Sequence, residues 1–283
     1  MEFLTGTSGL FVFFAVLAAA MAIERLAPWR RAPVDIARWT RNGLMSFYAA
    51  VILGLLPFLS AAGAALAAQA RGAGLLHQID APLWVGVLGA VVILDLVAFL
   101  QHRALHRFYF LWRTHRTHHT DAAIDATTAL RFHPLETVFR AATEAPVIFA
   151  LGLPLEGVLM SYAAFLAANM FTHANIRLPA RIERALSLII ITPRAHRLHH
   201  AANEEFRESN FGTIFSVWDR IAGVFKSPGK LHTDEVFGVT GPEAMEAETF
   251  ANMALDPFRR RPPEAPIASG LGEERAPRSA LED

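Results

Sequence analysis

Histidine is the residue type in this chain whose number and spacing point to chemistry. Ten of the twelve histidines lie between positions 102 and 200, and most fall in three motifs, HRALH (102–106), HRTHH (115–119) and HRLHH (196–200). Residues at i, i+3 and i+4 share one face of a helix, so each motif presents its imidazoles in one direction. Together with a single histidine at 173 they form a set of nine candidate metal ligands: His102, His106, His115, His118, His119, His173, His196, His199 and His200.

Nine imidazoles are more than one metal ion uses, since a closed structural zinc site takes about four ligands. They are enough for two ions that each keep an open position, which is the arrangement that suits oxygen activation. The chain has no cysteine, which excludes disulfides, thiolate-ligated haem, cysteine-ligated iron–sulfur clusters and cysteine zinc sites. Imidazole, with or without carboxylate, suits iron, zinc, copper or nickel.

Three further polar residues are candidates for positions beside the metals. Asp95 lies in an apolar run, where a carboxylate is costly and is by default a functional hypothesis. It is expected to orient a histidine or arginine of another helix, or to form a structural ion pair. His133 is a candidate extra ligand, a helix-start residue or, preferably, a hydrogen-bond partner of a ligand. The amide of Asn169, four residues before His173, is expected to ligate weakly or to bind a water molecule, whereas His77 and His232 are interpreted as ordinary loop histidines.

The composition predicts a membrane protein. Of the 283 residues, 53% are hydrophobic and only 18% are charged, compared with about 25% charged in soluble domains. Apolar runs at 3–23, 42–70 and 81–101 are long enough to span a bilayer, and Gly54 and Pro57 are expected to kink the second one. A cleavable signal sequence is the less favoured interpretation of the first run, because its basic residues follow it. The zero net charge gives no argument for nucleic acid as a partner.

The order of these runs predicts an all-α integral membrane bundle with a cytoplasmic helical cap that carries the histidines. Arginines crowd the 25–41 loop and the segment after residue 101, so the positive-inside rule places both in the cytoplasm and the N-terminus outside. A helical hairpin is expected over 135–173, with Arg140 and Glu144 on a protected face. The predicted division is N-terminal transmembrane helices at 1–89, a catalytic domain at 90–230 and an extension at 231–283 whose tail is disordered from about residue 256.

At these motifs the chain resembles the fatty acid hydroxylase superfamily, also called the sterol desaturase family. The resemblance rests on HRALH, HRTHH and HRLHH in that order, supported by RFHPLE, FTHAN and NFGTIFSVWDRIAGVF, and it covers roughly residues 90–226. It implies that the nine histidines hold two iron ions, for which zinc is a possible substitute. Some relatives have a histidine where this chain has Asn169, so the ligand number at one metal is open.

The resemblance also implies an activity and partners. The expected reaction uses O2 as co-substrate and two electrons to hydroxylate or desaturate a lipid or sterol-like substrate taken from the bilayer. Since no cytochrome b5-like segment is present, the electrons are expected from an external donor, which is a reductase, a ferredoxin or a cytochrome. The alternatives are a carotenoid-type hydroxylase or ketolase, a membrane metal transporter or store, and a non-catalytic protein with vestigial ligands. The sequence carries no signal for an oligomeric state.

Overall fold

Long helices dominate the structure. The computed structural model describes residues 7–232, 234–239 and 249–259, and within these ranges the chain forms helices and isolated bridges but no β-strand. The all-helical prediction is therefore confirmed for the described part. The longest helices are α1 (Thr7–Leu26), α2 (Ile36–Gly54), α5 (Leu83–Arg107), α7 (Pro134–Leu151) and α8 (Leu155–His173).

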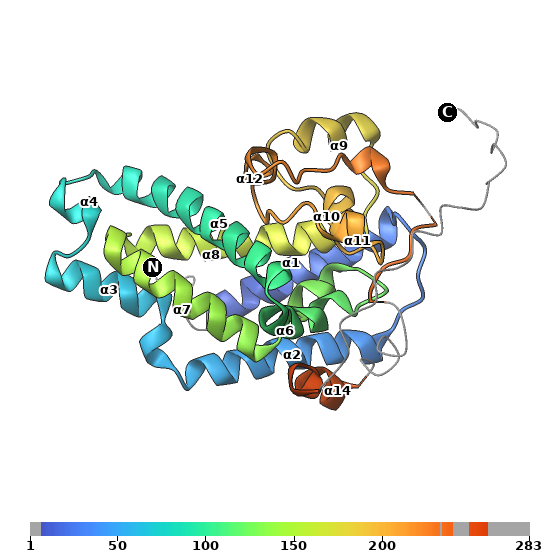
Figure 1. The fold of residues 1–283 in the computed structure, drawn as a ribbon, viewed down its shortest axis with the longest axis horizontal. Coiled ribbons are helices and arrows are strands. Elements are labelled where there is room, and N and C mark those ends of the chain that lie inside the picture. Colours follow the sequence, from blue (N-terminus) through green and yellow to red (C-terminus); the bar gives the residue numbers. More distant parts are fainter. Residues whose placement is uncertain (1–6, 233, 240–248, 260–283) are drawn as a thin grey trace.

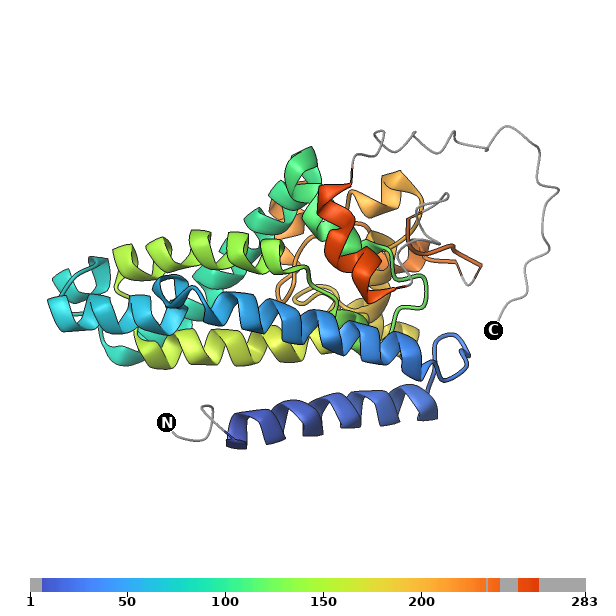
Figure 2. The ribbon, with the colours of Figure 1, turned by 90° about the horizontal axis from the view of Figure 1, so that it is seen from below.

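These helices form an elongated bundle, with a set of short helices at one end (Figures 1 and 2). Helix α5 packs along α8, while α7 packs against α2 and α3. The short helices carry or support two of the three histidine motifs. They are α6 (Tyr109–His119), α9 (Ala180–Leu186), α10 (Pro193–His199), α11 (Glu204–Arg207) and α12 (Val217–Ile221).

The predicted hairpin over 135–173 is formed by α7 and α8. Helix α7 starts at Pro134 and ends at Leu151, and its C-cap Gly152 has a φ of 67°, a left-handed conformation that glycine adopts without strain. Pro154 then precedes the first residue of α8. The turn is packed tightly, because a Cβ on Gly74 would lie 2.2 Å from the backbone nitrogen of Gly152. Residues far apart in sequence thereby close the end of the bundle opposite the histidines.

The second apolar run differs from the prediction. Residues 42–70 do not form one kinked helix: α2 ends at Gly54, a 3-10 turn covers Pro57–Leu59, and α3 (Ala61–Arg71) starts afresh. Proline has no N–H to continue the helical hydrogen bonds, and the Ser60 hydroxyl accepts from the backbone of Gly63 and caps the new helix. The run therefore contributes two helices joined by a turn.

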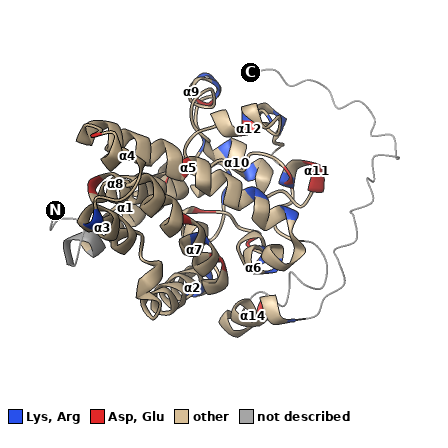
Figure 3. Cartoon of the chain, turned by 60° about the vertical axis from the view of Figure 1, so that its left-hand side comes forward, with Lys and Arg blue, Asp and Glu red and all other residues tan. Residues whose placement is uncertain are grey.

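Two described helices, α5 and α8, are long and apolar enough to cross a membrane. Large apolar side chains also lie exposed on the bundle surface, including Phe58 at 76% and Trp84 at 66%. Figure 3 shows that Lys and Arg positions gather on the short helices around α6 and α10, and that few lie on the bundle. An apolar bundle with a basic end is the surface expected of a membrane protein.

Buried charges fix the histidine-bearing segment to the bundle. Arg38 on α2 pairs with Asp121, at 2.8 Å, and with Asp125, both in the segment that follows α6. Arg131 donates to the carbonyl of Thr117 and to the hydroxyl of Thr120. These contacts tie the end of α6 to α2.

The C-terminal part packs on the same end. Helix α14 (Phe250–Leu255) lies against α2, and Arg116 pairs with Asp256 in the 3-10 turn η5 (Asp256–Phe258). The predicted disordered tail lies, from residue 260 on, outside the described residues.

Candidate metal centre

The nine histidines of the three motifs and position 173 converge into two groups. Within each group every residue has one candidate ligand atom, and these atoms lie within 4.8 Å of one another. The first group holds His102, His106, His115, His119 and His199. The second holds His118, His173, His196 and His200.

Helix geometry divides the motifs between the two groups in a regular way. In HRTHH the i and i+4 residues, His115 and His119, enter the first group, and the i+3 residue enters the second. In HRLHH the division is reversed, so that His196 and His200 enter the second group and His199 enters the first. Helices α6 and α10 therefore each contribute histidines to both groups, which holds the two sites side by side.

The ring nitrogens are spaced as ligands of a common ion. In the first group Nε2 of His115 lies 3.0 Å from Nε2 of His102 and 3.2 Å from Nε2 of His119. In the second, Nε2 of His173 lies 3.1 Å from the Nε2 atoms of His118 and of His196. Two nitrogens bound about 2.1 Å from one ion, at right angles, would be about 3.0 Å apart. The donor set and its spacing therefore fit a metal ion in each group.

Hydrogen bonds on the opposite ring nitrogen fix the proton of several histidines. Nδ1–H of His102 donates to the carbonyl of Phe211 at 2.7 Å, and that of His173 donates to the carbonyl of Asn169 at 2.7 Å. His199 donates in the same way to the carbonyl of Ser209 at 2.9 Å. A neutral imidazole has one proton, so Nε2 of each is left as a bare lone pair directed into the group.

Carboxylates bind the Nδ1 atoms of two other histidines in the same way. Nδ1 of His115 lies 2.9 Å from the buried carboxylate of Glu136, and Nδ1 of His106 lies 3.1 Å from that of Glu208. Bare Nε2 atoms of His102 and His115 then face each other at 3.0 Å, which is repulsive unless a cation lies between them. This arrangement is the strongest structural sign of a metal.

Burial keeps the imidazoles neutral. Desolvation lowers the pKa of His115, His118 and His119 well below 6.5, and neighbouring imidazoles lower each pKa further. The same causes lower the pKa of His196 and of His200. Since a metal binds the unprotonated nitrogen, these shifts keep the groups ready to bind at neutral pH.

Comparison with known proteins agrees with this geometry. Residues 87–224 match the family model for fatty acid hydroxylase. These residues form a fatty acid hydroxylase domain. The matched range contains all nine clustered histidines and the loop carbonyls that orient them, so the predicted resemblance is confirmed.

Curated relatives of this hydroxylase domain include three lipid enzymes. The chain is 29% identical over 180 residues to ornithine lipid hydroxylase OlsE of Rhizobium tropici, which covers 64% of this chain and 52% of the relative. Human alkylglycerol monooxygenase is 30% identical over 141 residues (50% of this chain, 30% of the relative), and human lathosterol oxidase is 26% identical over 149 (53% and 48%). The alignments thus span about half of the first and third relatives and about a third of the second. No solved structure matches the chain.

Three residues that the sequence indicates as partners of the metals, Asp95, His133 and Asn169, make other contacts in the structure. Among the described residues, the Asp95 carboxylate hydrogen-bonds to no histidine or arginine and forms no ion pair. It accepts hydrogen bonds from the backbone N–H groups of Ile214 and Phe215 and from the indole of Trp218, at 2.8–3.1 Å. The carboxylate is satisfied by N–H groups of the 210–218 loop, and this loop provides the Phe211 carbonyl that orients His102. Asp95 therefore holds the loop that carries this carbonyl.

His133 lies at the start of α7 rather than beside a ligand. Its Nδ1 accepts from the backbone of Leu135, and its Nε2 donates to the carbonyl of Ala254. Of the three roles considered for it, the structure shows the helix-start role. The side-chain amide of Asn169 donates to the carbonyl of Ala129 at 3.1 Å, and it is the backbone carbonyl of Asn169 that orients His173.

Sequence reasoning missed Glu136 and Glu208 as partners of ligands. Glu136 had a local signal, since it stands four residues before Arg140 in the first turn of a helix, and Arg140 binds it at 2.9 Å. Glu208 lies in an exposed segment and has no signal in the sequence. His77 and His232 belong to neither histidine group.

A cavity of about 410 Å³ inside the bundle reaches toward the histidines. A second, small cavity is lined by histidines of both groups. The two cavities share four lining residues, Phe132, Arg140, Phe165 and Asn169. The hydroxylase domain thus has an apolar chamber between membrane-type helices that leads to the candidate metal centre.

Proposed function

We propose that this chain is a membrane-bound non-haem di-iron oxygenase that hydroxylates or desaturates a C–H bond of a lipid or sterol-like substrate. The observation that carries the proposal is the pair of histidine groups, in which ring nitrogens face one another at 3.0–3.2 Å and those of His102 and His115 are both bare. The first group would hold one iron through five imidazoles, and the second would hold the other through four. Zinc fits the same ligands and is a possible substitute in purified protein.

Iron bound in this way would supply the activation of O2, with two electrons from an external reductase, ferredoxin or cytochrome. In hydroxylation one oxygen atom enters the C–H bond and the other leaves as water. The protein's own groups position and protect this chemistry. Glu136 and the loop carbonyls hold the Nδ1 protons, so that each ligand keeps its ring orientation. The apolar chamber lets a hydrocarbon chain approach and keeps bulk water away.

The relatives support a lipid substrate. Their names refer to ornithine lipid, alkylglycerol and lathosterol, which share a long hydrocarbon part and differ in their polar groups. In this chain the chamber lies between α5, α7 and α8, so the substrate would reach it from the bilayer. The basic residues around the histidine end support our proposal that the metal centre lies on the cytoplasmic side, with the N-terminus outside.

The test is metal analysis combined with product analysis on the full chain in nanodiscs. Protein loaded with ferrous iron should hold about two ions per chain and consume O2 only when reductant and a lipid extract are both present. Mass spectrometry with ¹⁸O2 should show one labelled oxygen in a lipid product, or a loss of two hydrogens for desaturation. Two bound irons with neither product would refute the proposed reaction, and a chain that binds no iron would refute the proposed centre.

A further inference from the structure

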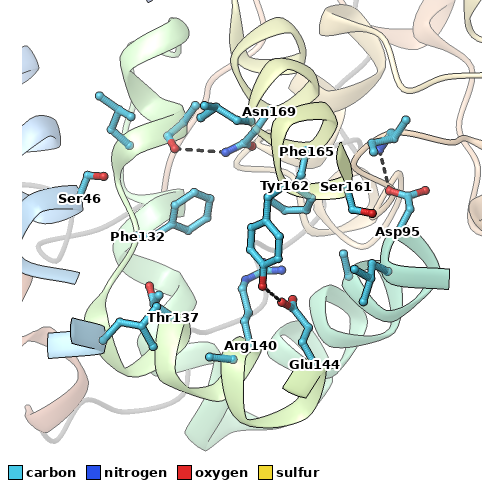
Figure 4. Close-up of a pocket in the computed structure, with 18 of the residues that line it drawn as sticks. Ser46, Asp95, Phe132, Thr137, Arg140, Glu144, Ser161, Tyr162, Phe165 and Asn169 are labelled. Atoms are coloured by element: carbon cyan, nitrogen blue, oxygen red, sulfur yellow. Dashed lines mark hydrogen bonds between the residues drawn. The ribbon is translucent and has the colours of Figure 1, made fainter. Parts of the chain in front are cut away.

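The chamber contains one polar pair that the proposed reaction does not use. Figure 4 shows Tyr162 of α8 in the chamber with its hydroxyl directed at Glu144 of α7, and the hydroxyl donates to this carboxylate. Most of the surrounding wall is apolar, with Leu53, Val91 and Phe165 among the residues that form it. Tyr162 remains 43% exposed, so a ligand in the chamber can reach the pair.

A carboxylate at this place is costly, because it lies in a mostly apolar chamber beside α8, one of the two described helices that are long and apolar enough to cross a membrane. Ionisable groups within membrane helices are rare and by default indicate a substrate or ion site. The charged residues that line the chamber are Asp95, Arg140 and Glu144. Asp95 already accepts three hydrogen bonds, and Arg140 is held by Glu136 on a neighbouring turn of its own helix.

Glu144 therefore keeps acceptor capacity that faces the chamber. Tyr162 donates to it, and Gln101 also reaches it. A carboxylate can accept about four hydrogen bonds, and the Tyr162 oxygen can accept one more. The pair thus offers acceptors and negative charge, while the nearest cation, Arg140, is already bound to Glu136. Such a site favours a hydrogen-bond donor and repels an anion.

The pair is remote from the reacting carbon. Tyr162 stands eleven residues before His173 on α8, a rise of roughly 16 Å, and Glu144 stands eight residues after Glu136 on α7, a rise of roughly 12 Å. An extended chain covers about 3.5 Å in three bonds, so these distances correspond to about ten to fourteen bonds. The pair therefore selects a substrate by binding one of its polar groups, at a place far from the metals.

We infer that Glu144 and Tyr162 select lipids that carry a hydrogen-bond donor, a hydroxyl or an amide N–H, along the chain, and that they exclude a free fatty acid anion from the chamber. This inference names the substrate class of the proposed oxygenase and rests on that function. It predicts that recognition occurs in the chamber and does not require the metals.

The experiment measures lipid binding to the full chain in nanodiscs, by competition with a fluorescent fatty ester. The probes are methyl 12-hydroxyoctadecanoate, methyl octadecanoate and octadecanoate, which differ in one hydroxyl or one charge. The hydroxylated ester should bind about tenfold more tightly than the plain ester, as expected for one hydrogen bond to a charged acceptor. Octadecanoate should bind more weakly than either ester.

Two variants and two controls assign the preference to the pair. Tyr162→Phe and Glu144→Gln should each reduce the preference for the hydroxylated ester several-fold, and Glu144→Gln should also improve binding of octadecanoate. Tyr48→Phe, whose ring packs on Phe250 outside the chamber, and Glu156→Gln, at the exposed start of α8, should leave all three affinities unchanged.

Equal binding of the two esters to the unmodified chain, or a preference that survives in both variants, would overturn the inference. These outcomes are separate from a failure of the proposed oxygenase function, because binding is measured without turnover and iron content is determined independently. A chain that binds two irons and shows no selectivity would keep the function and lose the substrate class.

Discussion

His115 of α6 and Glu136 of α7 are joined across the two helices, with imidazole Nδ1 2.9 Å from a carboxylate oxygen. The carboxylate is completely buried, and Arg140 binds its other oxygen at 2.9 Å. The chain of Arg140, Glu136 and His115 therefore connects the wall of the apolar chamber to a candidate ligand. It also fixes which ring nitrogen of His115 is free to bind a metal.

Replacing Glu136 with glutamine should weaken one of the two metals. The amide is similar in size but has no charge. Because it can present an N–H to Nδ1 of His115, it no longer fixes which ring nitrogen carries the proton. Loss of such a partner typically costs 10–100-fold in metal affinity. Competition with a chelator should therefore show one ion released more easily and the other unchanged. Glu156→Gln is the matched control, and equal retention of both ions in Glu136→Gln would contradict this role.

Single histidine variants should separate the two groups. His199→Ala removes a ligand of the first group, and His118→Ala removes a ligand of the second, although each lies next to histidines of the other group. His118→Ala leaves three imidazoles in the second group and should hold roughly one iron instead of two, because about four ligands are needed for a stable site. His199→Ala leaves four imidazoles in the first group, so it should keep two irons but release one of them more easily to a chelator. The double variant should hold roughly one iron, in the weakened first group.

The control for this series is His232→Ala, an exposed position outside both groups, which should keep two irons. If His118→Ala retains two ions per chain, the assignment of ligands to groups is wrong. Metal content is measured by inductively coupled plasma mass spectrometry on protein whose size-exclusion elution profile matches that of the unmodified chain.

The histidine groups were predictable because helical spacing is a local property. The i, i+4 pairs of HRTHH and HRLHH each remain together in one group, as their spacing requires. The assignment of the i+3 residues, His118 and His199, to the opposite group was not predictable. It depends on how α6 and α10 approach each other, and that is set by long-range packing.

The residues that orient the ligands were mostly beyond sequence reasoning. Backbone carbonyls of Phe211 and Ser209 hold two histidines, and a carbonyl has no signature in the side-chain sequence. Asp95 was recognised as unusual because a carboxylate in an apolar run is costly, but its partners are N–H groups about 120 residues away. The cost of burial was visible in the sequence, whereas the groups that offset it were not.

Close approach of α5 and α8 should make Gly157 sensitive to substitution. A Cβ at Gly157 would lie 2.8 Å from the Cβ of Ala90 and 3.0 Å from Cα of Val87, so Gly157→Ala must push the helices apart. Overpacking of this kind costs about 1–3 kcal/mol. Gly89 lies on the same α5 helix with nothing within 4 Å, so Gly89→Ala should be neutral or stabilising by up to about 1 kcal/mol.

The measurement is the midpoint of thermal unfolding in detergent for both variants beside the unmodified chain. Gly157→Ala should unfold at a lower temperature than Gly89→Ala. The reverse order would show that α5 and α8 do not pack through this glycine.

Of the arginines in α2, Arg38 should lower the free energy of unfolding most when it is replaced with alanine. It pairs with Asp121 and Asp125 in a buried site, and its loss leaves two carboxylates with reduced compensation. Breaking a buried ion pair on one side typically destabilises by about 3–5 kcal/mol. Arg38→Ala should therefore lower the unfolding temperature strongly at pH 7, while Arg31→Ala, at an exposed position, should have little effect.

The pH dependence of stability tests the same network of Arg38 and Asp121 in a second way. Burial alone would raise the pKa of Asp121, but Arg131 and Arg38 outweigh it and hold this pKa below its usual 3.8. A carboxyl whose folded pKa is depressed contributes stability above its unfolded pKa and loses that contribution as pH falls through the folded value. Without Arg38 the pKa of Asp121 should rise, so Arg38→Ala should lose less further stability than the unmodified chain when pH falls from 5 to below 3.8. Melting curves at pH 7, 5 and 3.5 measure this, and parallel losses in both proteins would mean that Arg38 contributes nothing to the charge state of Asp121.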